Sequence, residues 1–305
     1  MISTTNKRDG ATEDLVAVIL AAGLGTRLLP VTKAMPKEML PLVDRPILHY
    51  ILEEVVDSGL DRAVIVTARG KDAIHSYFDR VPELDRVLES RGELDRLSSV
   101  QRIIDACHIT YVRQHEQLGI AHAVLAAQHA IGPHAFVLYF PDDVITAEVP
   151  ATRQLLDVYH RYNASVLAVE PVRKEDTRLY GIVDAEPLGG GVFKVKGLVE
   201  KPLPEDAPSN LGIVGRYVLT PSIFPAIEET SPGANGELQI TDSLRLLLEE
   251  EPIYAYAFTG HRYDTGNPVG YLRATVALAL QRPDLAAEVR QCLMELLGSP
   301  SAPHV

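Results

Sequence analysis

Cysteine is scarce in this chain. Only Cys107 and Cys292 occur among its 305 residues, and they lie far apart in the sequence. Two isolated cysteines supply neither a disulfide framework nor the four ligands of a structural zinc site. We therefore expect a protein of a reducing compartment, the cytoplasm, without a tetrahedral metal cluster.

Positive charge is also in short supply. The chain carries 29 Lys and Arg residues against 41 Asp and Glu residues, and its formal net charge is −12 at pH 7. This balance favours solubility and argues against a nucleic acid or an anionic membrane surface as the main partner. A small anionic ligand would need a local basic pocket.

Long hydrophobic runs are missing as well. The most apolar N-terminal stretch, residues 15–24, is far too short to span a bilayer. Glu13 and Asp14 precede it at the place where a signal peptide would carry positive charge. We therefore expect neither a membrane segment nor a secretory signal.

Strand-like and helical patterns alternate along the chain. The run "LVAVILAA" from Leu15 is continuously apolar, which is typical of a parallel strand covered on both faces. Helical spacing follows in "ILHYILEEVVDSGL", and Gly59 stands where a helix often ends. Further strands are expected in "RAVIVTA", "HITYVRQ", "AFVLYFPDD", "SVLAVEPV", "GIVDAE", "FKVKGLVEKP", "LGIVGRYVLT" and "IYAYAF". The alternation predicts an α/β protein with a mainly parallel sheet.

One domain accounts for this pattern better than two. We expect a polar, disordered arm over residues 1–14, a single domain over residues 15–297 and a flexible tail over residues 298–305. Residues 72–106 are long, charged and helical in pattern, so we interpret them as a solvated insertion between two strands.

Two phosphate-binding motifs are incomplete after the first strand. A dinucleotide-binding fingerprint requires a third glycine where Leu28 stands, and the Gly-Lys-Ser/Thr of a Walker loop is absent. What remains is a glycine loop with a hydroxyl and two cations: Gly23, Gly25, Thr26, Arg27 and Lys37. Glycine amides can approach an anion closely, and Arg and Lys add charge-assisted bonds to phosphate oxygens. The loop therefore predicts a polyphosphate cradle at the carboxyl end of the first strand.

The whole string "LAAGLGTRLLPVTKAMPKEMLP" resembles the signature of the sugar-1-phosphate nucleotidyltransferases, specifically the bacterial UTP:glucose-1-phosphate uridylyltransferases. The later strings "YVRQHEQLGIAHAV", "VEKP", "APSNLGIVGRYVLTP", "GELQITDSL" and "RYDTGNPVGYL" resemble that family's motifs in the same order. The resemblance implies a Rossmann-like mixed sheet flanked by helices with peripheral insertions, the nucleotide-diphospho-sugar transferase fold. It also implies transfer of a uridylyl group from UTP to glucose-1-phosphate, which gives UDP-glucose and pyrophosphate.

The resemblance assigns a role to each matching residue. The catalytic cations would be Arg27, Lys37 and Lys201. The nucleotide would be bound by Ala21, Ala22, Gly23, Gly25, Thr26, Gln114 and Gly119. Glu200 would accept bonds from the sugar hydroxyls, and Gly181 and Gly215 would let backbone groups reach the hexose. The reaction needs no general base, because the attacking phosphate oxygen is already negative.

Asp142 and Asp264 match the two aspartates that bind Mg²⁺ in the family. Mg²⁺ prefers few carboxylates together with water and phosphate oxygens. We expect Asp143, the second of two consecutive acids, to face solvent. Two departures from the family pattern, Ala121 for a second glycine and Pro141 before the metal aspartate, lie near the expected positions of the base and the metal.

Three alternatives stay open at this stage. The same chemistry could use dTTP or another sugar-1-phosphate, and the amide of Gln114 cannot by itself distinguish uracil from thymine. A catalytically weak regulatory paralogue is a different class, which the intact cations and aspartates disfavour. A dehydrogenase is the remote third. The family resemblance further implies a homodimer or homotetramer, for which residues 270–297 offer an apolar helical face.

Overall fold

The computed structural model describes residues 15–233 and 236–298, so the expected arm and residues 299–305 of the expected tail lie outside the described residues. Within those ranges, nine strands form one mixed sheet in the order β5, β4, β1, β6, β11, β8, β12, β10, β9. The strands are β1 (Val16–Leu20), β4 (Arg62–Thr67), β5 (His108–Arg113), β6 (Phe136–Tyr139), β8 (Val166–Pro171), β9 (Gly181–Gly189), β10 (Val192–Glu200), β11 (Leu211–Leu219) and β12 (Tyr254–Ala257).

The first part of the sheet is parallel. β1 runs parallel to both β4 and β6, and β4 runs parallel to β5. Their carboxyl ends share one edge of the sheet, which is where open α/β sheets bind their ligands. The phosphate-binding loop predicted from the sequence leaves β1 at this edge.

The second part of the sheet is mostly antiparallel. β11 is antiparallel to β6 and β8, and β10 is antiparallel to β9 and β12; β12 and β8 are parallel. The prediction of a mainly parallel sheet therefore holds only up to β6. The difference arises because a hairpin, with Gly189 and Gly190 at positive φ, joins β9 to β10 where a crossover helix would be needed for a parallel pair.

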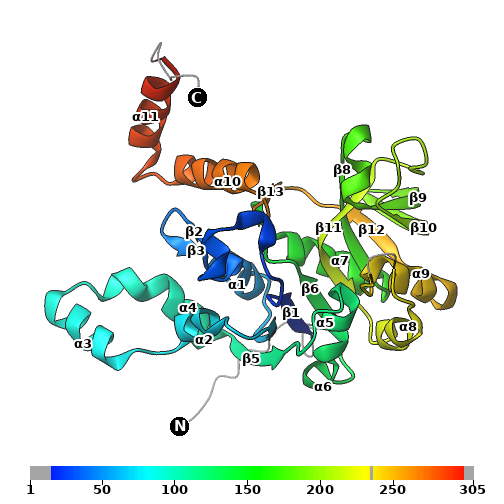
Figure 1. The fold of residues 1–305 in the computed structure, drawn as a ribbon, viewed down its shortest axis with the longest axis horizontal. Coiled ribbons are helices and arrows are strands. Elements are labelled where there is room, and N and C mark those ends of the chain that lie inside the picture. Colours follow the sequence, from blue (N-terminus) through cyan, green and yellow to red (C-terminus); the bar gives the residue numbers. More distant parts are fainter. Residues whose placement is uncertain (1–14, 234–235, 299–305) are drawn as a thin grey trace, which may run out of the picture.

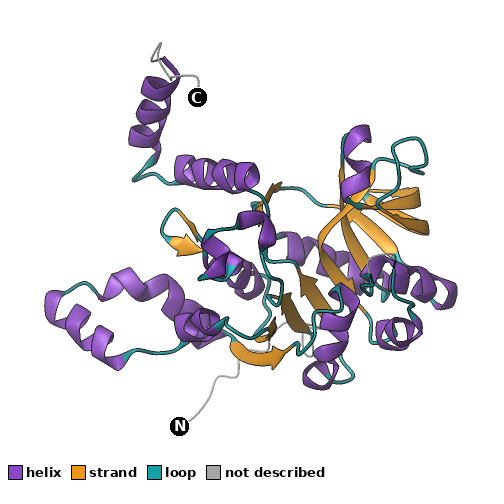
Figure 2. Ribbon diagram, viewed as in Figure 1, coloured by secondary structure: helices purple, strands orange, loops and turns teal. Residues whose placement is uncertain are grey.

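Helices cover both faces of the sheet (Figure 1; Figure 2). Val16 and Val18 of β1 belong to one hydrophobic core, and Ala17 and Ile19 belong to the core on the opposite face. This explains why the strand is apolar at every position. The first core includes α5 (Ile120–Ala126), α6 (Gln128–Ile131), α8 (Ile223–Glu229) and α9 (Ile240–Glu250), and the second includes α1 (Ile47–Asp57) and α7 (Ala151–Tyr162).

A short two-stranded ribbon stands apart from the main sheet. It pairs β7 (Asp143–Thr146) with β13 (His261–Asp264) in antiparallel register, and Asp264 lies opposite Asp143. A second small ribbon pairs β2 (Pro41–Leu42) with β3 (Arg45–Pro46). The β7 and β13 ribbon therefore brings together two segments that are distant in the sequence and that each carry one aspartate.

Two helical extensions leave the body of the molecule (Figure 1). The charged insertion folds as α2 (Asp72–Phe78), α3 (Pro82–Arg91), a 3₁₀ turn and α4 (Ser98–Ala106), as the sequence predicts. The C-terminal part forms α10 (Pro268–Gln281) and α11 (Ala286–Gly298), and α11 points away from the sheet. Across the described ranges, we find no helix with the length and apolar character needed to cross a membrane.

Candidate active site

Residues 21–39 form the loop that the sequence predicts to bind phosphate, at the carboxyl end of β1. The backbone N–H of Ala21 donates to Val66 O at 2.7 Å, and the carbonyl of Ala22 accepts a bond from Gln117 Nε2 at 2.9 Å. The chain then passes through three short 3₁₀ turns, Thr26–Leu28, Val31–Lys33 and Lys37–Met39. The loop is thus fixed at its start by two neighbouring segments, while its glycines remain near the surface.

Arg27 is available to a ligand. Its side chain is exposed, and among the described residues it makes no hydrogen bond or ion pair. Thr26 and Gly23 are exposed beside it. Three of the predicted phosphate-binding residues of the loop are therefore open to solvent.

Lys37 contacts the predicted metal ligand Asp142 directly. Its Nζ lies 2.6 Å from Asp142 Oδ2, and the two side chains are only 18% and 22% exposed. Burial by itself would lower the pKa of Lys37, but the charges of Asp142 and Glu38 outweigh burial, so the pKa is raised. Burial likewise works against the ionised form of Asp142, but Lys37 holds the pKa of this carboxyl below its usual value. Both groups are therefore charged at neutral pH.

A buried ion pair lies next to Lys37. Lys71, just before α2, donates to both carboxylate oxygens of Glu38 at 3.0 and 2.8 Å, and neither side chain is more than 9% exposed. Burial raises the pKa of Glu38 and lowers that of Lys71. Because Glu38 follows Lys37 in the same turn, this pair fixes the backbone that carries Lys37.

Asp142 and Asp264 converge on one small space. A Cβ atom added at Gly266 would lie 2.8 Å from Asp142 Oδ2 and 3.0 Å from Asp264 Oδ1. Thr265 donates from its N–H and its hydroxyl to the carbonyl of Asp142, at 2.8 and 2.9 Å. The structure therefore brings the two predicted metal ligands together, and the glycine keeps the space between their oxygens free of a side chain.

This space fits Mg²⁺ better than a transition metal. Among the described residues, there is no cluster of three or more His, Cys, Asp or Glu side chains that could hold a metal ion. Two carboxylates leave most positions of an octahedral ion to water and phosphate oxygens, as Mg²⁺ prefers. The residues that would hold the ion are Asp142 and Asp264.

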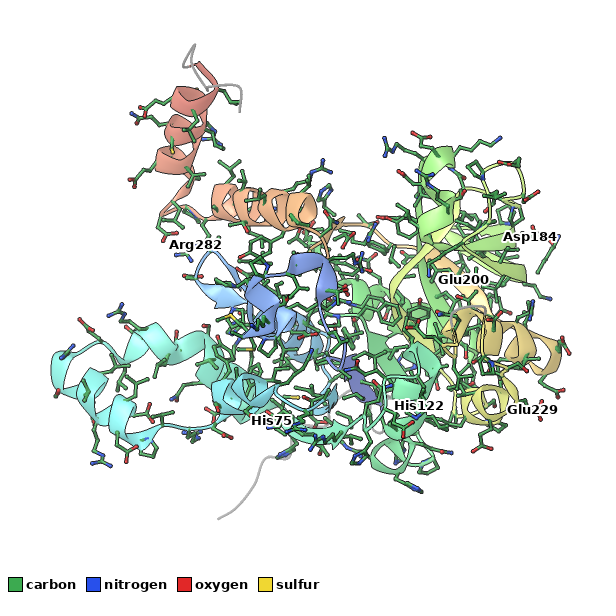
Figure 3. All side chains as sticks on the ribbon, in the orientation of Figure 1. His75, His122, Asp184, Glu200, Glu229 and Arg282 are labelled. Carbon is green, nitrogen blue, oxygen red and sulfur yellow. The ribbon has the colours of Figure 1, made fainter. Side chains whose placement is uncertain are left out.

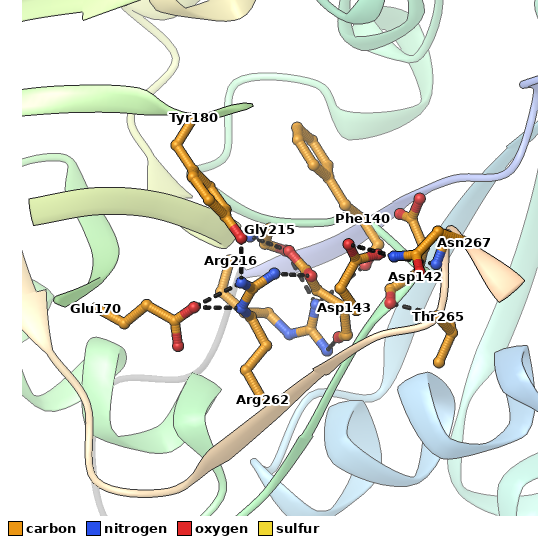
Figure 4. Close-up of polar contacts among 12 residues, drawn as sticks. Phe140, Asp142, Asp143, Glu170, Tyr180, Gly215, Arg216, Arg262, Thr265 and Asn267 are labelled. Atoms are coloured by element: carbon orange, nitrogen blue, oxygen red, sulfur yellow. Dashed lines mark hydrogen bonds and ion pairs between the residues drawn. The ribbon is translucent and has the colours of Figure 1, made fainter. Parts of the chain in front are cut away.

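Asp143 does not face solvent, so the expectation for this residue is wrong. Its side chain is 13% exposed, with Oδ1 2.7 Å from Arg262 Nη1 and Oδ2 accepting from the N–H of Gly215 at 2.7 Å (Figure 4). Burial raises the pKa of Asp143, and Arg262 opposes that effect. Arg262 and Gly215 therefore engage both carboxylate oxygens of Asp143 within the protein.

Arg216 holds the backbone of the Asp142 loop. This fully buried side chain donates to the carbonyls of Phe140, Gly215 and Asp143, at 3.3, 2.9 and 2.9 Å (Figure 4). Glu54 of α1 balances its charge, with the closest contact at 2.7 Å. The loop that carries Asp142 is therefore attached to the core through one arginine.

Gln114, predicted to bind the base, is buried and already engaged. Its Nε2 donates to the carbonyl of Gly119 at 3.2 Å and lies 2.9 Å from Nδ1 of His122 on α5. His122, labelled in Figure 3, therefore helps to orient this amide. Because an amide nitrogen can only donate, the oxygen Oε1 is the part of Gln114 left for a ligand.

Gly119 has its own structural requirement. Its φ is +105°, and an added Cβ would lie 2.6 Å from Leu238 O. The next departure from the family pattern, Ala121, is fully buried in a hydrophobic core, and its N–H donates to the same carbonyl. The extra methyl group of Ala121 therefore packs into the protein rather than on its surface.

The predicted sugar-binding residues of β9 and β10 lie together. Gly181 pairs with Glu200 across the two strands, and Glu200 lies at the end of β10 (Figure 3). Thr241 donates to Glu200 Oε2 at 2.7 Å, while Lys201 Nζ lies 2.7 Å from Oε1. A side chain at position 181 would crowd both Thr241 and Glu200. The cation and the carboxylate expected to contact the sugar phosphate and the sugar are thus adjacent.

Gly215 is glycine for a reason that the sequence does not reveal. An added Cβ would lie 2.6 Å from Phe140 Cβ and 2.8 Å from Asp143 Oδ2. Its N–H donates to Asp143, and its carbonyl accepts from Phe140 N and Arg216. The structure therefore places Gly215 against the Asp142 loop. Crowding by this loop explains a glycine at position 215 without any contact with a sugar.

Several residues of the site were missed from the sequence. For Arg216 a signal exists, because a charged residue inside an apolar strand must be paired. For the others the partner is far away in the chain, as with Arg262 and Asp143, which are 119 residues apart. The missed set comprises Glu38, Glu54, Lys71, Gln117, Tyr180, Arg216, Thr241 and Arg262.

Comparison with known proteins identifies the family of this chain. Residues 16–281 match the family described as Nucleotidyl transferase. The UTP–glucose-1-phosphate uridylyltransferase YngB of Bacillus subtilis is 45% identical over 281 residues, which cover 92% of this chain and 95% of that protein. A UDP-glucose pyrophosphorylase crystallised with UDP-glucose superposes with a TM-score of 0.82 at 40% identity, covering 88% of this chain and 99% of the other. A UTP-bound enzyme of the same name from Acinetobacter baumannii gives a TM-score of 0.86 at 36% identity, with 92% and 99% covered. The chain belongs to the nucleotidyl transferase family.

Proposed function

We propose that the protein transfers a uridylyl group from UTP to glucose-1-phosphate and releases pyrophosphate. An oxygen of the sugar phosphate attacks the α-phosphorus of UTP, and the bond from that phosphorus to the oxygen of the departing pyrophosphate breaks. The observation that carries the proposal is the convergence of Lys37, Asp142 and Asp264 beside the loop that presents Arg27. Relatives that bind UTP or UDP-glucose at 36–40% identity support the same substrates.

Positioning and charge neutralisation do the chemical work in this proposal. Arg27 and Lys37 neutralise the phosphates of the nucleotide, and the amides of Gly25 and Thr26 line them. Gln114 Oε1 accepts from the base, and Ala21, Ala22 and Gly23 supply backbone contacts. Mg²⁺ at Asp142 and Asp264 would reduce the repulsion between the two phosphate groups.

The sugar would bind at β9 and β10. Glu200, held by Thr241, would accept bonds from glucose hydroxyls, and the half-exposed Lys201 would contact the sugar phosphate. Lys201 lies at a positive φ of 47°, and its N–H donates to the carbonyl of Tyr180 at 3.0 Å. Its backbone is therefore constrained even though its ammonium group is accessible.

The test is pyrophosphate release from UTP, dTTP, ATP, CTP and GTP with glucose-1-phosphate and Mg²⁺. We expect fast, Mg²⁺-dependent release with UTP that is lost in Asp142→Ala and Lys37→Ala. If the protein prefers dTTP, the proposed metal and phosphate site stands, but the assignment of uracil as the base is wrong. Tight binding of UDP-glucose without turnover of any nucleotide would indicate a regulatory paralogue instead.

We also infer a homo-oligomer joined through the C-terminal helices, in the cytoplasm. No residue of α11 is buried, and Met294, Leu296 and Leu297 are 61%, 70% and 87% exposed. Val269 and Leu272 of α10 are 68% and 62% exposed. A helix that points away from the body and exposes large apolar side chains suits a contact with a second copy of the chain. The scarcity of cysteine in the sequence supports the proposal of a reducing compartment.

A further inference from the structure

Arg262 connects two regions of the site that belong to different strand pairs. From β13 its Nη1 lies 2.7 Å from Asp143 Oδ1 on β7. On its other side, Nε donates to Glu170 Oε1 of β8 at 2.6 Å and Nη2 donates to Tyr180 Oη at 2.7 Å (Figure 4). One side chain therefore contacts the metal-site ribbon and the segment that precedes β9.

The geometry of these contacts requires arginine. The side chain is 9% exposed, and its donors point in fixed directions toward two carboxylates and a phenol. A guanidinium group can serve such divergent acceptors at once because it is planar and carries five N–H donors. A lysine ammonium is a compact charge on a flexible stem, so it can satisfy only part of this set.

Each end of the connection adjoins a different predicted part of the site, the metal aspartates at one end and the sugar-binding residues at the other. Asp143 follows the metal ligand Asp142, and Arg262 lies on the same strand as Asp264. Tyr180 precedes Gly181, and its carbonyl accepts from the N–H of Lys201. Among the described residues, no hydrogen bond joins the Tyr180 side chain to Asp143 directly, whereas Arg262 bonds to both. A displacement at one end would reach the other through Arg262.

We propose that Arg262 is a positioning residue that fixes the sugar-phosphate end of the site relative to the metal aspartates. This inference rests on the proposed function and deepens it, because it names what sets the approach of the attacking phosphate oxygen to the α-phosphorus. Arg262 touches neither reacting group in this arrangement. It acts through Asp143 on one side and through Tyr180 on the other.

Each variant in the test changes one part of the connection, and its effect is measured at another part. Tyr180→Phe removes one hydroxyl near the sugar site, and the affinity for Mn²⁺ is then measured at the metal site by electron paramagnetic resonance. Arg262→Lys retains the positive charge but removes the branched guanidinium group, and the kcat and the KM values for glucose-1-phosphate and UTP are measured by pyrophosphate release. Arg173→Lys is the matched control, because Arg173 forms an exposed ion pair with Asp176 outside the site.

We expect Tyr180→Phe to weaken Mn²⁺ binding at least threefold, and to have no such effect in the Arg262→Lys background. Arg262→Lys should raise the KM for glucose-1-phosphate at least fivefold and lower kcat, while the KM for UTP stays within twofold. If the role of Arg262 were purely structural, Arg262→Lys would change the KM values for both substrates together. Unchanged Mn²⁺ affinity in Tyr180→Phe, or an unchanged KM for glucose-1-phosphate in Arg262→Lys, would overturn the proposal.

Two features of the experiment distinguish a failure of the proposed connection from a failure of the proposed function or of folding. The Mn²⁺ measurement requires no turnover, so a failure of the proposed function appears as absent turnover in the unmodified protein, independently of the connection. If Arg262→Lys does not fold, Glu170→Gln takes its place, because it weakens one contact of the same guanidinium. Glu170→Gln should then raise the KM for glucose-1-phosphate at least twofold, and no change would count against the proposal.

Discussion

Lys37 Nζ lies 2.6 Å from Asp142 Oδ2, the same oxygen that borders the space next to Gly266. One carboxylate oxygen therefore faces both a fixed ammonium group and the predicted place of Mg²⁺. Since two cations repel each other, Lys37 and a metal ion must compete for this oxygen when no nucleotide is present. Nucleotide phosphates would offer Lys37 another anionic partner.

Lys37→Met should separate metal binding from catalysis. We expect Mn²⁺ to bind several-fold more tightly without nucleotide, because the competing ammonium group is gone. The kcat should fall by about 100-fold or more, since a charge that stabilises the transition state is lost. Titration calorimetry and pyrophosphate release measure the two effects. Weaker Mn²⁺ binding in this variant would contradict the competition.

The Lys37 and Asp142 pair should contribute stability that is constant across the neutral pH range. The pKa of Asp142 is lowered in the fold, so its contribution is present above the unfolded value of 3.8 and is lost as pH falls through the folded value. The pKa of Lys37 is raised, so its contribution is present below 10.5 and is lost only as pH rises further.

In metal-free buffer, Lys37→Met should therefore lower the free energy of unfolding by about 2 kcal/mol, equally at pH 5, 7 and 9. Urea denaturation at the three pH values measures this difference. Lys33→Met, an exposed lysine in the same loop, is the control and should have little effect. A difference that disappears by pH 5 would show that Asp142 takes up its proton well above its ordinary pKa of 3.8, which contradicts a lowered pKa.

Arg216 should affect the metal site and stability by separable routes. Arg216→Met leaves Glu54 buried without its partner, which should cost about 3–5 kcal/mol of unfolding free energy. Adding Glu54→Gln removes the unpaired charge, while the amide oxygen can still accept from Thr152. The double variant should recover much of the stability. Both variants should bind Mn²⁺ more weakly than the unmodified protein, because no side chain donates to the carbonyls of Phe140 and Asp143 once Arg216 is replaced.

Chemical denaturation and Mn²⁺ titration test these variants side by side. If the double variant regains both stability and metal affinity, the clamp on the Asp142 loop is not what positions the carboxylate.

Gly266→Ala should block the space between the two aspartates. The new methyl group would lie 2.8 Å from Asp142 Oδ2 and 3.0 Å from Asp264 Oδ1, closer than packed atoms allow. We expect Mn²⁺ affinity to fall at least tenfold. Gly197→Ala is a matched control, because the nearest atom to its added Cβ is 3.7 Å away. Equal metal affinity in the two variants would place the ion elsewhere.

Charges on the apolar face of α11 should reduce the size of the assembly. Met294→Asp with Leu297→Asp introduces two charges onto side chains that are 61% and 87% exposed. Light scattering after size exclusion should report a lower mass than for the unmodified protein. Gln291→Asp adds a charge to the same helix at a polar position and should not change the mass. If the unmodified protein itself has the mass of a monomer, the proposal of an oligomer is wrong.

Local patterns predicted the parallel part of the fold well. β1 (Val16–Leu20) and α1 (Ile47–Asp57) lie where continuous apolarity and helical spacing predict them, because both patterns are formed by residues that are neighbours in the sequence. In the antiparallel part, the glycine triplet 189–191 predicts the hairpin turn that joins β9 to β10, but the pairings of β11 with β6 and β8 were not foreseen, because a strand pattern does not reveal which distant strand it will join.

The candidate site divides in the same way. Arg27 and Lys37 could be predicted, because the glycine loop and its cations are contiguous in the sequence. Asp143 could not be interpreted correctly, since its partner Arg262 is 119 residues away, and Arg216 meets Glu54 across 162 residues. Ionic contacts between distant segments leave no periodic signal, so they become visible only in three dimensions.

The register of the β7 and β13 ribbon limits how this site can change. Asp264 lies directly opposite Asp143, and successive side chains of a strand point to opposite faces. Insertion or deletion of a single residue in either short strand would turn Asp264 or Asp143 to the wrong side, although every residue type is kept. Length changes in homologues of this chain should therefore fall outside residues 143–146 and 261–264, even where substitutions inside them are tolerated.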